Sequence, residues 1–321
     1  MGYVYALLAA VLFGANGSVT KVVIEAGLSP TQLTQYRVLG TAVIAGLVLL
    51  ATNHRGFRVP RRTLLFLAIL GVTGVALLQA SYAAALERLP VGIALLIEYT
   101  AVLMVALVGF LFLGEKVRAR IWVAIGCVLV GLAVVAQIWT NALDPLGVAL
   151  GFVAAITLTV YFVVGERQVS STPPLVVAFW TMTFAALFWA FFSGWWAVRP
   201  AILVHPVSLS GNLAAIVVPV WVPLAWNILL GTFAPFWLSF HALKRMSATA
   251  AGVVATSEVV FAFLVAWAWL GEQLDGVQIV GAVVVLVGIV LAQTARANSV
   301  VDADLALRPQ ENISSNVGRR S

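Results

Sequence analysis

Charged side chains are scarce in this sequence, and it contains a single cysteine. Only 9% of the 321 residues are Asp, Glu, Lys or Arg, whereas 62% are hydrophobic. A soluble domain has roughly 25% charged residues. No water-soluble fold can bury so much apolar surface, so the composition predicts a polytopic membrane protein. The lone Cys127 excludes an internal disulfide.

Catalytic and cofactor motifs are also missing. The sequence has no G-x-S-x-G, no H-E-x-x-H, no Walker A loop and no His and Cys cluster with metal-ligand spacing. We therefore expect a protein that is not an enzyme, needs no cofactor or metal, and is not driven by nucleotide hydrolysis. The net charge of +6 does not indicate a nucleic-acid partner, because the basic residues lie between apolar runs, as in loops that orient membrane helices.

Ten apolar runs are long enough to span a bilayer as helices, which takes about 20 residues each. They are residues 3–25, 31–52, 63–86, 91–113, 118–139, 145–165, 173–195, 218–242, 248–270 and 276–295. The predicted fold class is an all-α polytopic membrane protein. The longest link, residues 198–213, contains Pro200, Pro206 and Gly211, and we expect an irregular loop or a short amphipathic segment there.

The basic residues predict how these spans are oriented. Fourteen lie on one side of the membrane, three on the other, and Arg37 lies near the start of the second span. The positive-inside rule then puts both termini in the cytoplasm. The larger set is Arg55, Arg58, Arg61, Arg62, Lys116, Arg118, Arg120, Arg167, Lys244, Arg245, Arg296, Arg308, Arg319 and Arg320; the smaller is Lys21, Arg88 and Arg199. The first run lacks a basic flank, which favours a spanning helix over a signal peptide.

Two stretches of the chain resemble each other, Leu86–Glu115 and Leu243–Glu272. Each has one interior carboxylate, Glu98 or Glu258, and each ends in L-G-E. Five spans per half is an odd number, so halves at residues 1–140 and 141–297 must have opposite topology, followed by a polar tail, 298–321, that we expect to be disordered. Inverted repeats are the usual construction of secondary transporters, with the substrate site near the midplane.

These features resemble a known family. The paired halves, the L-G-E endings, Phe13-Gly14 and the pattern Gly231-x-x-x-Pro235-Phe236 are similar to the EamA-type branch of the drug/metabolite transporter superfamily. Within it, Pro90–Thr100 is similar to the threonine/homoserine exporter group. The resemblance covers residues 3–295 and implies a ten-helix exporter of small metabolites, often amino acids, in the cytoplasmic (inner) membrane. It also implies a central cavity lined by spans 1, 3, 4, 6, 8 and 9.

Two carboxylates inside the spans are the main candidates for function. At 1.5 Å per residue, Glu98 and Glu258 both lie within a few ångström of the bilayer midplane. A charge there costs about 2.5–3.5 kcal/mol on insertion scales. The pair can share a proton, bind a substrate ammonium or couple transport to protons. In the alternative, each carboxylate accepts hydrogen bonds from nearby Thr or Ser and only joins helices.

Neutral polar and aromatic residues inside the spans form a second group of candidates. Amides and hydroxyls can hydrogen-bond an amino-acid-like substrate, and aromatic faces can bind an ammonium through cation–π attraction. Alternatively, such residues join helices or form an interfacial belt. The candidates are Asn16, Gln79, Tyr82, Tyr99, Thr100, Tyr161, Trp180, Asn227 and Trp237.

Residues near the span ends are expected to have structural roles. We expect Glu115 and Glu272 to reach interfacial water, and Arg37 and Lys21 to extend to the lipid headgroups. The alternative for Arg37 and Lys21 is that they hold a substrate carboxylate near the exit. His241 is expected to be a plain interfacial histidine rather than a gate.

Taken together, the sequence predicts a secondary carrier that exports small metabolites, with amino acids as the favoured class and protons as the candidate coupling ion. Two other hypotheses remain open. One is an exporter of cationic or aromatic toxic compounds. The other is a membrane protein that binds a partner and transports nothing. The expected partners are a small-molecule substrate and membrane lipid, and the oligomeric state is left open.

Overall fold

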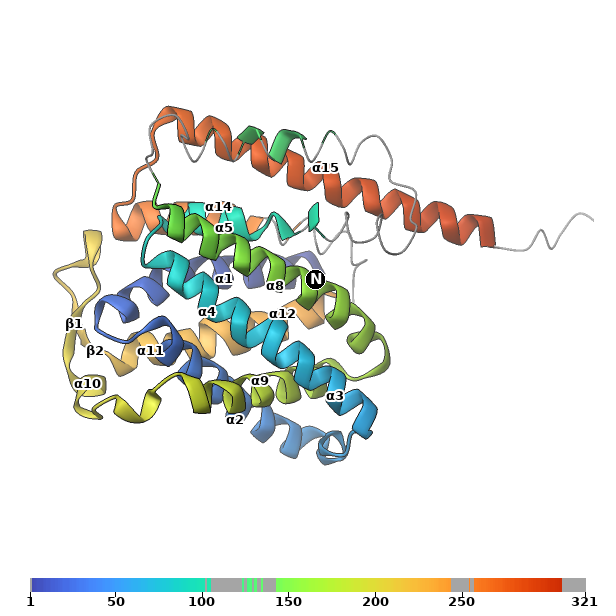
Figure 1. Ribbon diagram of the computed structural model, residues 1–321, viewed down its shortest axis with the longest axis horizontal. Coiled ribbons are helices and arrows are strands. Elements are labelled where there is room, and N and C mark those ends of the chain that lie inside the picture. Colours follow the sequence, from blue (N-terminus) through green and yellow to red (C-terminus); the bar gives the residue numbers. More distant parts are fainter. Residues whose placement is uncertain are drawn as a thin grey trace, which may run out of the picture.

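Helices make up most of the structure, which is a computed structural model (Figure 1). It describes residues 2–101, 103–104, 123, 126–128, 130–131, 134, 143–243, 254 and 257–307, without the side chains of residues 162, 166, 167, 169, 170, 240 and 292–307. Most of the expected span 118–139, the end of 91–113, the start of 248–270 and Glu115 lie outside the described residues.

Six helices in the described part of the chain are long and apolar enough to cross a membrane. They are Gly2–Glu25, Pro30–Thr52, Arg61–Leu86, Pro145–Gly165, Pro174–Phe192 and Trp221–Ser239. Each coincides with an expected span. Two shorter apolar helices, Ser257–Leu270 and Gly276–Leu291, also fall within expected spans.

The individual helices are labelled in Figure 1. They are α1 (Gly2–Glu25), α2 (Pro30–Thr52), α3 (Arg61–Ile69), α4 (Leu77–Leu86), α5 (Val91–Glu98), α8 (Pro145–Ser171), α9 (Pro174–Phe192), α10 (Ala201–Val204), α11 (Trp221–Ile228), α12 (Ala234–Leu243), α14 (Ser257–Val265) and α15 (Gly276–Leu307). Helix α15 continues to Leu307, whereas the sequence predicts that the last span ends at 295.

Local sequence explains where several helices begin and end. Ser29 caps α2: its hydroxyl accepts from the Gln32 N–H at 3.2 Å, and the Gln32 side chain accepts from the Ser29 N–H at 3.0 Å. Pro30 follows at the first helical position, where its missing N–H has no consequence. Gly27, with a φ of +102°, ends α1 in a backbone conformation that glycine adopts readily.

Three π-helical turns occur in the part of the chain that the structure describes. Leu70–Ala76 joins α3 to α4, Leu229–Phe233 joins α11 to α12, and Ala266–Leu270 follows α14. A π turn leaves the regular i to i−4 pattern of backbone bonds, and such turns occur often at functional sites. The turn at Leu229–Phe233 is the one that shapes the site described below.

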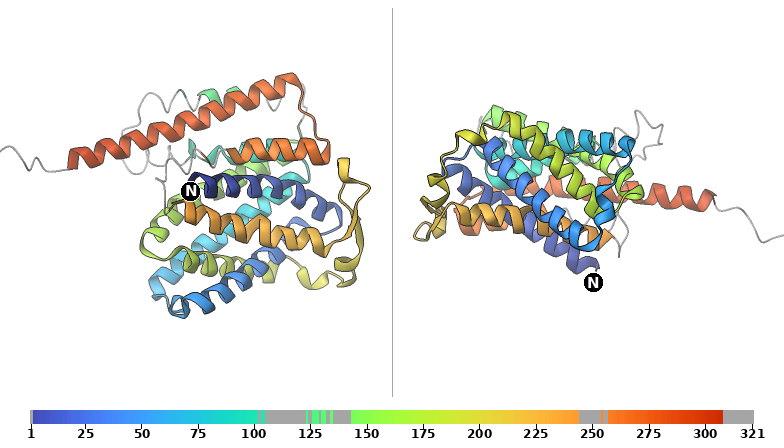
Figure 2. Two further views of the ribbon diagram at one scale, coloured as in Figure 1. Left: turned by 180° about the vertical axis from the view of Figure 1, so that it is seen from behind. Right: turned by 90° about the horizontal axis from the view of Figure 1, so that it is seen from below.

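Helix α5 lies at the centre of the largest apolar core. All eight of its residues are buried, as expected for a helix that is hydrophobic on every face. Its neighbours in this core include Val259 and Ala262 of α14 and Val285 of α15. Figures 1 and 2 show α15 along one side of the bundle, next to the layer that holds α5 and α14.

The outward faces of the long helices are apolar. On α2, Leu39, Val43 and Leu47 are 42%, 53% and 62% exposed, and their spacing of four residues places them on one face. Exposed apolar stripes of this kind are unfavourable in water and favourable in lipid. The helix lengths and these faces together indicate a multi-pass membrane protein.

One end of the bundle is closed by connecting segments, which include a small antiparallel sheet. Strands β1 (Pro206–Ser208) and β2 (Val217–Pro219) pair with Val207 opposite Val218. With α10 they form the 198–220 connection, at the left in Figure 1; this link therefore contains a hairpin that the sequence did not predict. At the same end, the bond from Arg88 to Asp144, 2.9 Å long, holds the pKa of the Asp144 carboxyl below its ordinary value.

Candidate functional site

The two predicted carboxylates come from helices that pack on each other. Glu98 is the last residue of α5 and is 9% exposed; Glu258 lies in the first turn of α14 and is partly buried. Tyr99 follows Glu98 directly, and its hydroxyl donates to the Glu258 Oε2 at 2.7 Å. This bond connects the two stretches that resemble each other in the sequence.

Arg37 also belongs to this region, and the expectation that it extends to the lipid headgroups is wrong. Its side chain is 7% exposed, its Nε donates to the Thr232 hydroxyl, and its Nη2 donates to the Gly231 carbonyl at 3.1 Å. The position of Arg37 along the predicted span could have indicated that it is buried. Arg37 lies seven residues after the start of α2 at Pro30, about 10 Å into the helix.

Pro235 explains why the Gly231 carbonyl accepts a bond from Arg37. In an α-helix this oxygen would accept from the N–H four residues later. That residue is Pro235, which has no N–H. The π turn and the Arg37 guanidinium satisfy the local backbone instead, and the Thr232 hydroxyl donates to the Asn227 carbonyl at 2.9 Å. The Gly-x-x-x-Pro pattern thus creates a docking point for a buried cation.

Helix α1 brings the surrounding helices together through small residues. A Cβ at Gly14 would lie 2.8 Å from the Glu258 carbonyl oxygen, and a Cβ at Gly17 would lie 2.9 Å from the Tyr82 hydroxyl. A Cβ at Gly231 would overlap the Asn16 side chain. These glycines therefore allow α1 to contact the backbone beside Glu258 and the π turn that holds Arg37.

The cluster contains three ionisable side chains and several buried side-chain oxygens that accept no hydrogen bond from described residues. Helix α1 packs against both the backbone at Glu258 and the π turn that binds Arg37. No described carboxylate forms an ion pair with Arg37 at 4.0 Å or less. Among the described residues, no partner hydrogen-bonds the Asn16 Oδ1, the Gln79 Oε1 or the Glu98 Oε2, although all three side chains are at least nine-tenths buried. Unfilled buried polar atoms are uncommon in folded proteins and often mark functional sites.

Some predicted site residues lie elsewhere. Trp180 stacks on Phe184 at 5.8 Å within a separate apolar cluster. Trp237 is 45% exposed and packs on His241 at 3.9 Å between ring centroids. We therefore leave both out of the candidate site. The sequence could not show this, because the helices that carry Trp180 and Trp237 are apolar on most faces. Their hydrophobic periodicity therefore does not indicate which way these two side chains face.

Three further predicted residues have intermediate positions. The Thr100 hydroxyl donates to the Ile97 carbonyl at 2.7 Å, within its own chain turn. Asn227 is fully buried and donates to the Thr20 hydroxyl at 3.2 Å, so it joins α11 to α1 next to the π turn. Tyr161 packs edge-on against Phe236 at 6.4 Å. These contacts join helices or stay within one turn.

At the end of the bundle that carries the hairpin, Lys21 and Glu272 form a second ionic contact. The Lys21 Nζ lies 2.5 Å from the Glu272 Oε1, and the Glu272 Oε2 accepts from the Val91 N–H at 2.8 Å. Lys21 therefore does not extend to the headgroups, and that expectation is wrong. Glu272 holds α1 against the N-terminus of α5, where a carboxylate also interacts favourably with the helix dipole.

We expect Glu272→Ala to lower the free energy of unfolding by about 1–2 kcal/mol, because it removes the acceptor at the start of α5 and leaves Lys21 without its partner. Lys21→Met should cost less, about 0.5 kcal/mol, because an ion pair that water reaches is weak. The measurement is unfolding by sodium dodecyl sulfate in mixed micelles, with Glu87→Ala as the control at an exposed carboxylate. Equal stabilities for Glu272→Ala and the control would contradict the role given to Glu272.

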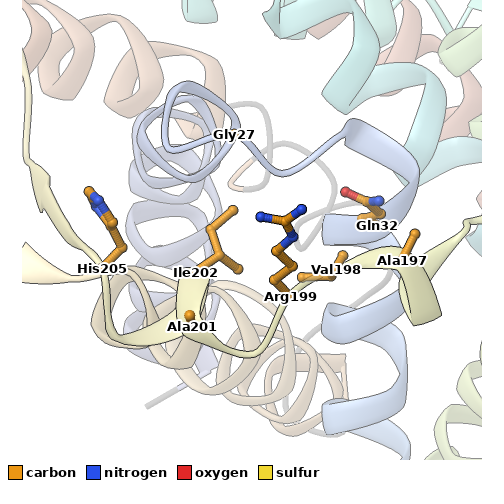
Figure 3. Close-up of a pocket in the computed structure, with 8 residues that line it drawn as sticks. All are labelled: Gly27, Gln32, Ala197, Val198, Arg199, Ala201, Ile202 and His205. Carbon is orange, nitrogen blue, oxygen red and sulfur yellow. The ribbon is translucent and has the colours of Figure 1, made fainter.

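Cavities formed by the described residues lie outside the charged cluster, and two of them are well defined by their lining residues. One of about 410 Å³ is lined by Gly27, Gln32, Ala197, Val198, Arg199, Ala201, Ile202 and His205. Figure 3 shows its polar side chains, Gln32, Arg199 and His205. The other, about 430 Å³, is lined by Asn212, Trp267, Ala268, Gly271 and Gln273. Within the described residues, no group of three or more His, Cys, Asp or Glu side chains could hold a metal ion.

Comparison with known proteins places the chain in a family. The EamA-like transporter family matches residues 1–137 and 145–294. A solved structure described only as "Crystal structure of protein" has the same fold, with a TM-score of 0.59 and 19% identity over 92% of this chain and 98% of that chain. No curated protein matches. Because the family match covers most of the sequence, the chain belongs to the EamA-like transporter family, whose members are membrane transporters of small molecules.

Proposed function

We propose that the protein is a secondary exporter of amino acids or closely related metabolites, similar to the threonine/homoserine exporter group. Its substrate would bind between two inverted five-helix halves that open alternately to each side. The observation that carries the proposal is the cluster of buried Arg37 and Glu98 with partly buried Glu258, to which the Tyr99 hydroxyl donates. The two family-matched stretches, residues 1–137 and 145–294, support the division into halves.

The net charge of the cluster favours a ligand or a proton that binds and is released during each transport cycle. One guanidinium and two carboxylates leave one net negative charge when all three are ionised. A lone charge at this depth is unfavourable, so a proton or a cationic group must balance it. An amino-acid ammonium meets this need, and so does a coupling proton, because either one can be taken up on one side and released on the other.

The contact between Lys21 and Glu272 supports an alternating mechanism. It joins α1 to the start of α5 at the end that we propose to be outside the cell. Alternating access requires such contacts to break and re-form during each cycle. In this proposal both termini face the cytoplasm, and the pair belongs to the outer gate.

A second candidate function is export of cationic or aromatic toxic compounds. The observation that favours it is the combination of two carboxylates with the aromatic side chains of Tyr82 and Tyr99, which can also bind an organic cation. This candidate differs from the first because its ligand needs no carboxylate. A protein that transports nothing would explain neither the buried charges nor their unfilled acceptors.

The test is flux in proteoliposomes. Purified protein is reconstituted into liposomes that contain an unlabelled pool of amino acids. Counterflow of each labelled amino acid is then measured with and without an imposed pH gradient. We expect counterflow of at least one amino acid above protein-free vesicles. Flux of tetraphenylphosphonium without flux of any amino acid would overturn the proposal and support the second candidate.

A further inference from the structure

We propose that Arg37 binds the carboxylate of the substrate, while Glu98 binds the ammonium. The inference deepens the proposed function and rests on it: the protein would select zwitterionic substrates with a free carboxylate, not amines in general. The argument depends on which donors and acceptors of the cluster remain unfilled.

Some N–H groups of Arg37 donate to no described residue. A guanidinium carries five N–H groups, and described residues accept from two of its nitrogens, Nε and Nη2, one bond each. Both acceptors, the Thr232 hydroxyl and the Gly231 carbonyl, are neutral, and no carboxylate among the described residues forms an ion pair with Arg37. Guanidinium binds carboxylate in a two-point geometry that neither hydroxyl nor carbonyl can supply.

The unfilled acceptors complement these donors. The Glu98 Oε2, the Gln79 Oε1 and the Asn16 Oδ1 all lack hydrogen-bond partners among the described residues. An ammonium has three N–H groups and no acceptor, so it could satisfy the unpartnered carboxyl oxygen of Glu98. An amine without a carboxylate would bind to Glu98 and leave Arg37 without an anion.

Position also favours a two-point ligand. Arg37 is fixed to the π turn between α11 and α12, and Asn16 of α1 touches the same turn at Gly231. Glu98 ends α5, and Tyr99 directly after it donates to Glu258. The Glu258 carbonyl oxygen would lie 2.8 Å from a Cβ at Gly14 of the same helix α1. A zwitterion could therefore connect α2 and the π turn to α5, whereas a purely structural arginine would need only the two bonds already present.

The experiment compares each acid with its carboxamide in one protein preparation. Thermal stabilisation of detergent-purified protein is measured with L-threonine and L-threoninamide, and with L-tryptophan, L-tryptophanamide and tryptamine. We expect wild type to bind at least one acid about tenfold or more tightly than its amide. Arg37→Gln should bring that ratio close to one, Arg37→Lys should restore part of it, and Arg55→Gln, at an exposed arginine, should leave it unchanged.

The ratio separates recognition from folding. A structural role for Arg37 would lower the melting temperature of Arg37→Gln and leave the acid-to-amide ratio as in wild type, which would overturn the inference alone. A wild type that responds equally to acid and amide would do the same while amino-acid counterflow remains. Response to tryptamine with none to any acid would overturn both this inference and the amino-acid function.

Discussion

Glu98→Gln is expected to reduce amino-acid counterflow by about a hundredfold, which corresponds to roughly 3 kcal/mol of lost binding or coupling energy. Glutamine keeps the size of the side chain and removes the charge. The Glu98 Oε2 is buried and has no partner among the described residues, so the carboxylate contributes little to helix packing that the amide could not replace. Its loss should therefore affect transport far more than stability.

The matched control is Glu87→Gln, the same chemical change at an exposed position eleven residues away. Counterflow by this variant should equal that of wild type, and both variants should remain monodisperse in detergent with similar melting temperatures. If Glu98→Gln transports at the wild-type rate, and does so at every pH tested, Glu98 neither binds the substrate nor exchanges a proton.

The fold was largely predictable because its elements depend on local sequence. A run of about 20 apolar residues forms a helix in lipid almost whatever its order, since every backbone polar group must be satisfied within the segment. The expected spans therefore coincide with α1 and α2 to within one or two residues. The end of α15 was not predicted, because charged and polar residues such as Arg296, Asn298, Asp302 and Asp304 interrupt the apolar run after residue 295.

The site was predictable only in part, because its key contacts join residues far apart in the chain. Glu98 and Glu258 could be found from the cost of a charge inside an apolar run. The hydrogen bond from Arg37 to Gly231 could not be predicted. Gly231 is 194 residues away, and its carbonyl can accept this bond because Pro235 has no N–H to donate to it. Likewise, Lys21 pairs with Glu272 across 251 residues. Charge counting finds such residues but does not show what they face.

The family motifs gain a physical meaning from these contacts. The phenylalanine of Phe13-Gly14 packs edge-on against the phenylalanine of Pro235-Phe236, with ring centroids 5.4 Å apart and planes at 89°. The glycine beside it meets the backbone of α14. Two short motifs separated by more than two hundred residues thus define one contact region, in which α1 touches both the helix that holds Glu258 and the helix that follows the π turn.

Gly14→Leu tests this contact region and is expected to lower the free energy of unfolding by about 3 kcal/mol. A Cβ at Gly14 would lie 2.8 Å from the Glu258 carbonyl oxygen and 2.9 Å from the Ala262 nitrogen. Both are backbone atoms, which cannot rotate away as a side chain can, so α14 must move. Because Glu258 moves with it, counterflow should also be lost.

Gly126→Leu is the control, because a Cβ at Gly126 would meet no atom of the described residues within 4 Å. Unfolding by sodium dodecyl sulfate in mixed micelles should give Gly126→Leu the stability of wild type or slightly more, since leucine favours a helix over glycine by about 1 kcal/mol. Should Gly14→Leu unfold at the same detergent fraction as this control and keep its flux, α1 would not contact α14 in the membrane as described. The position assigned to Glu258 would then have to be abandoned, because it depends on that contact.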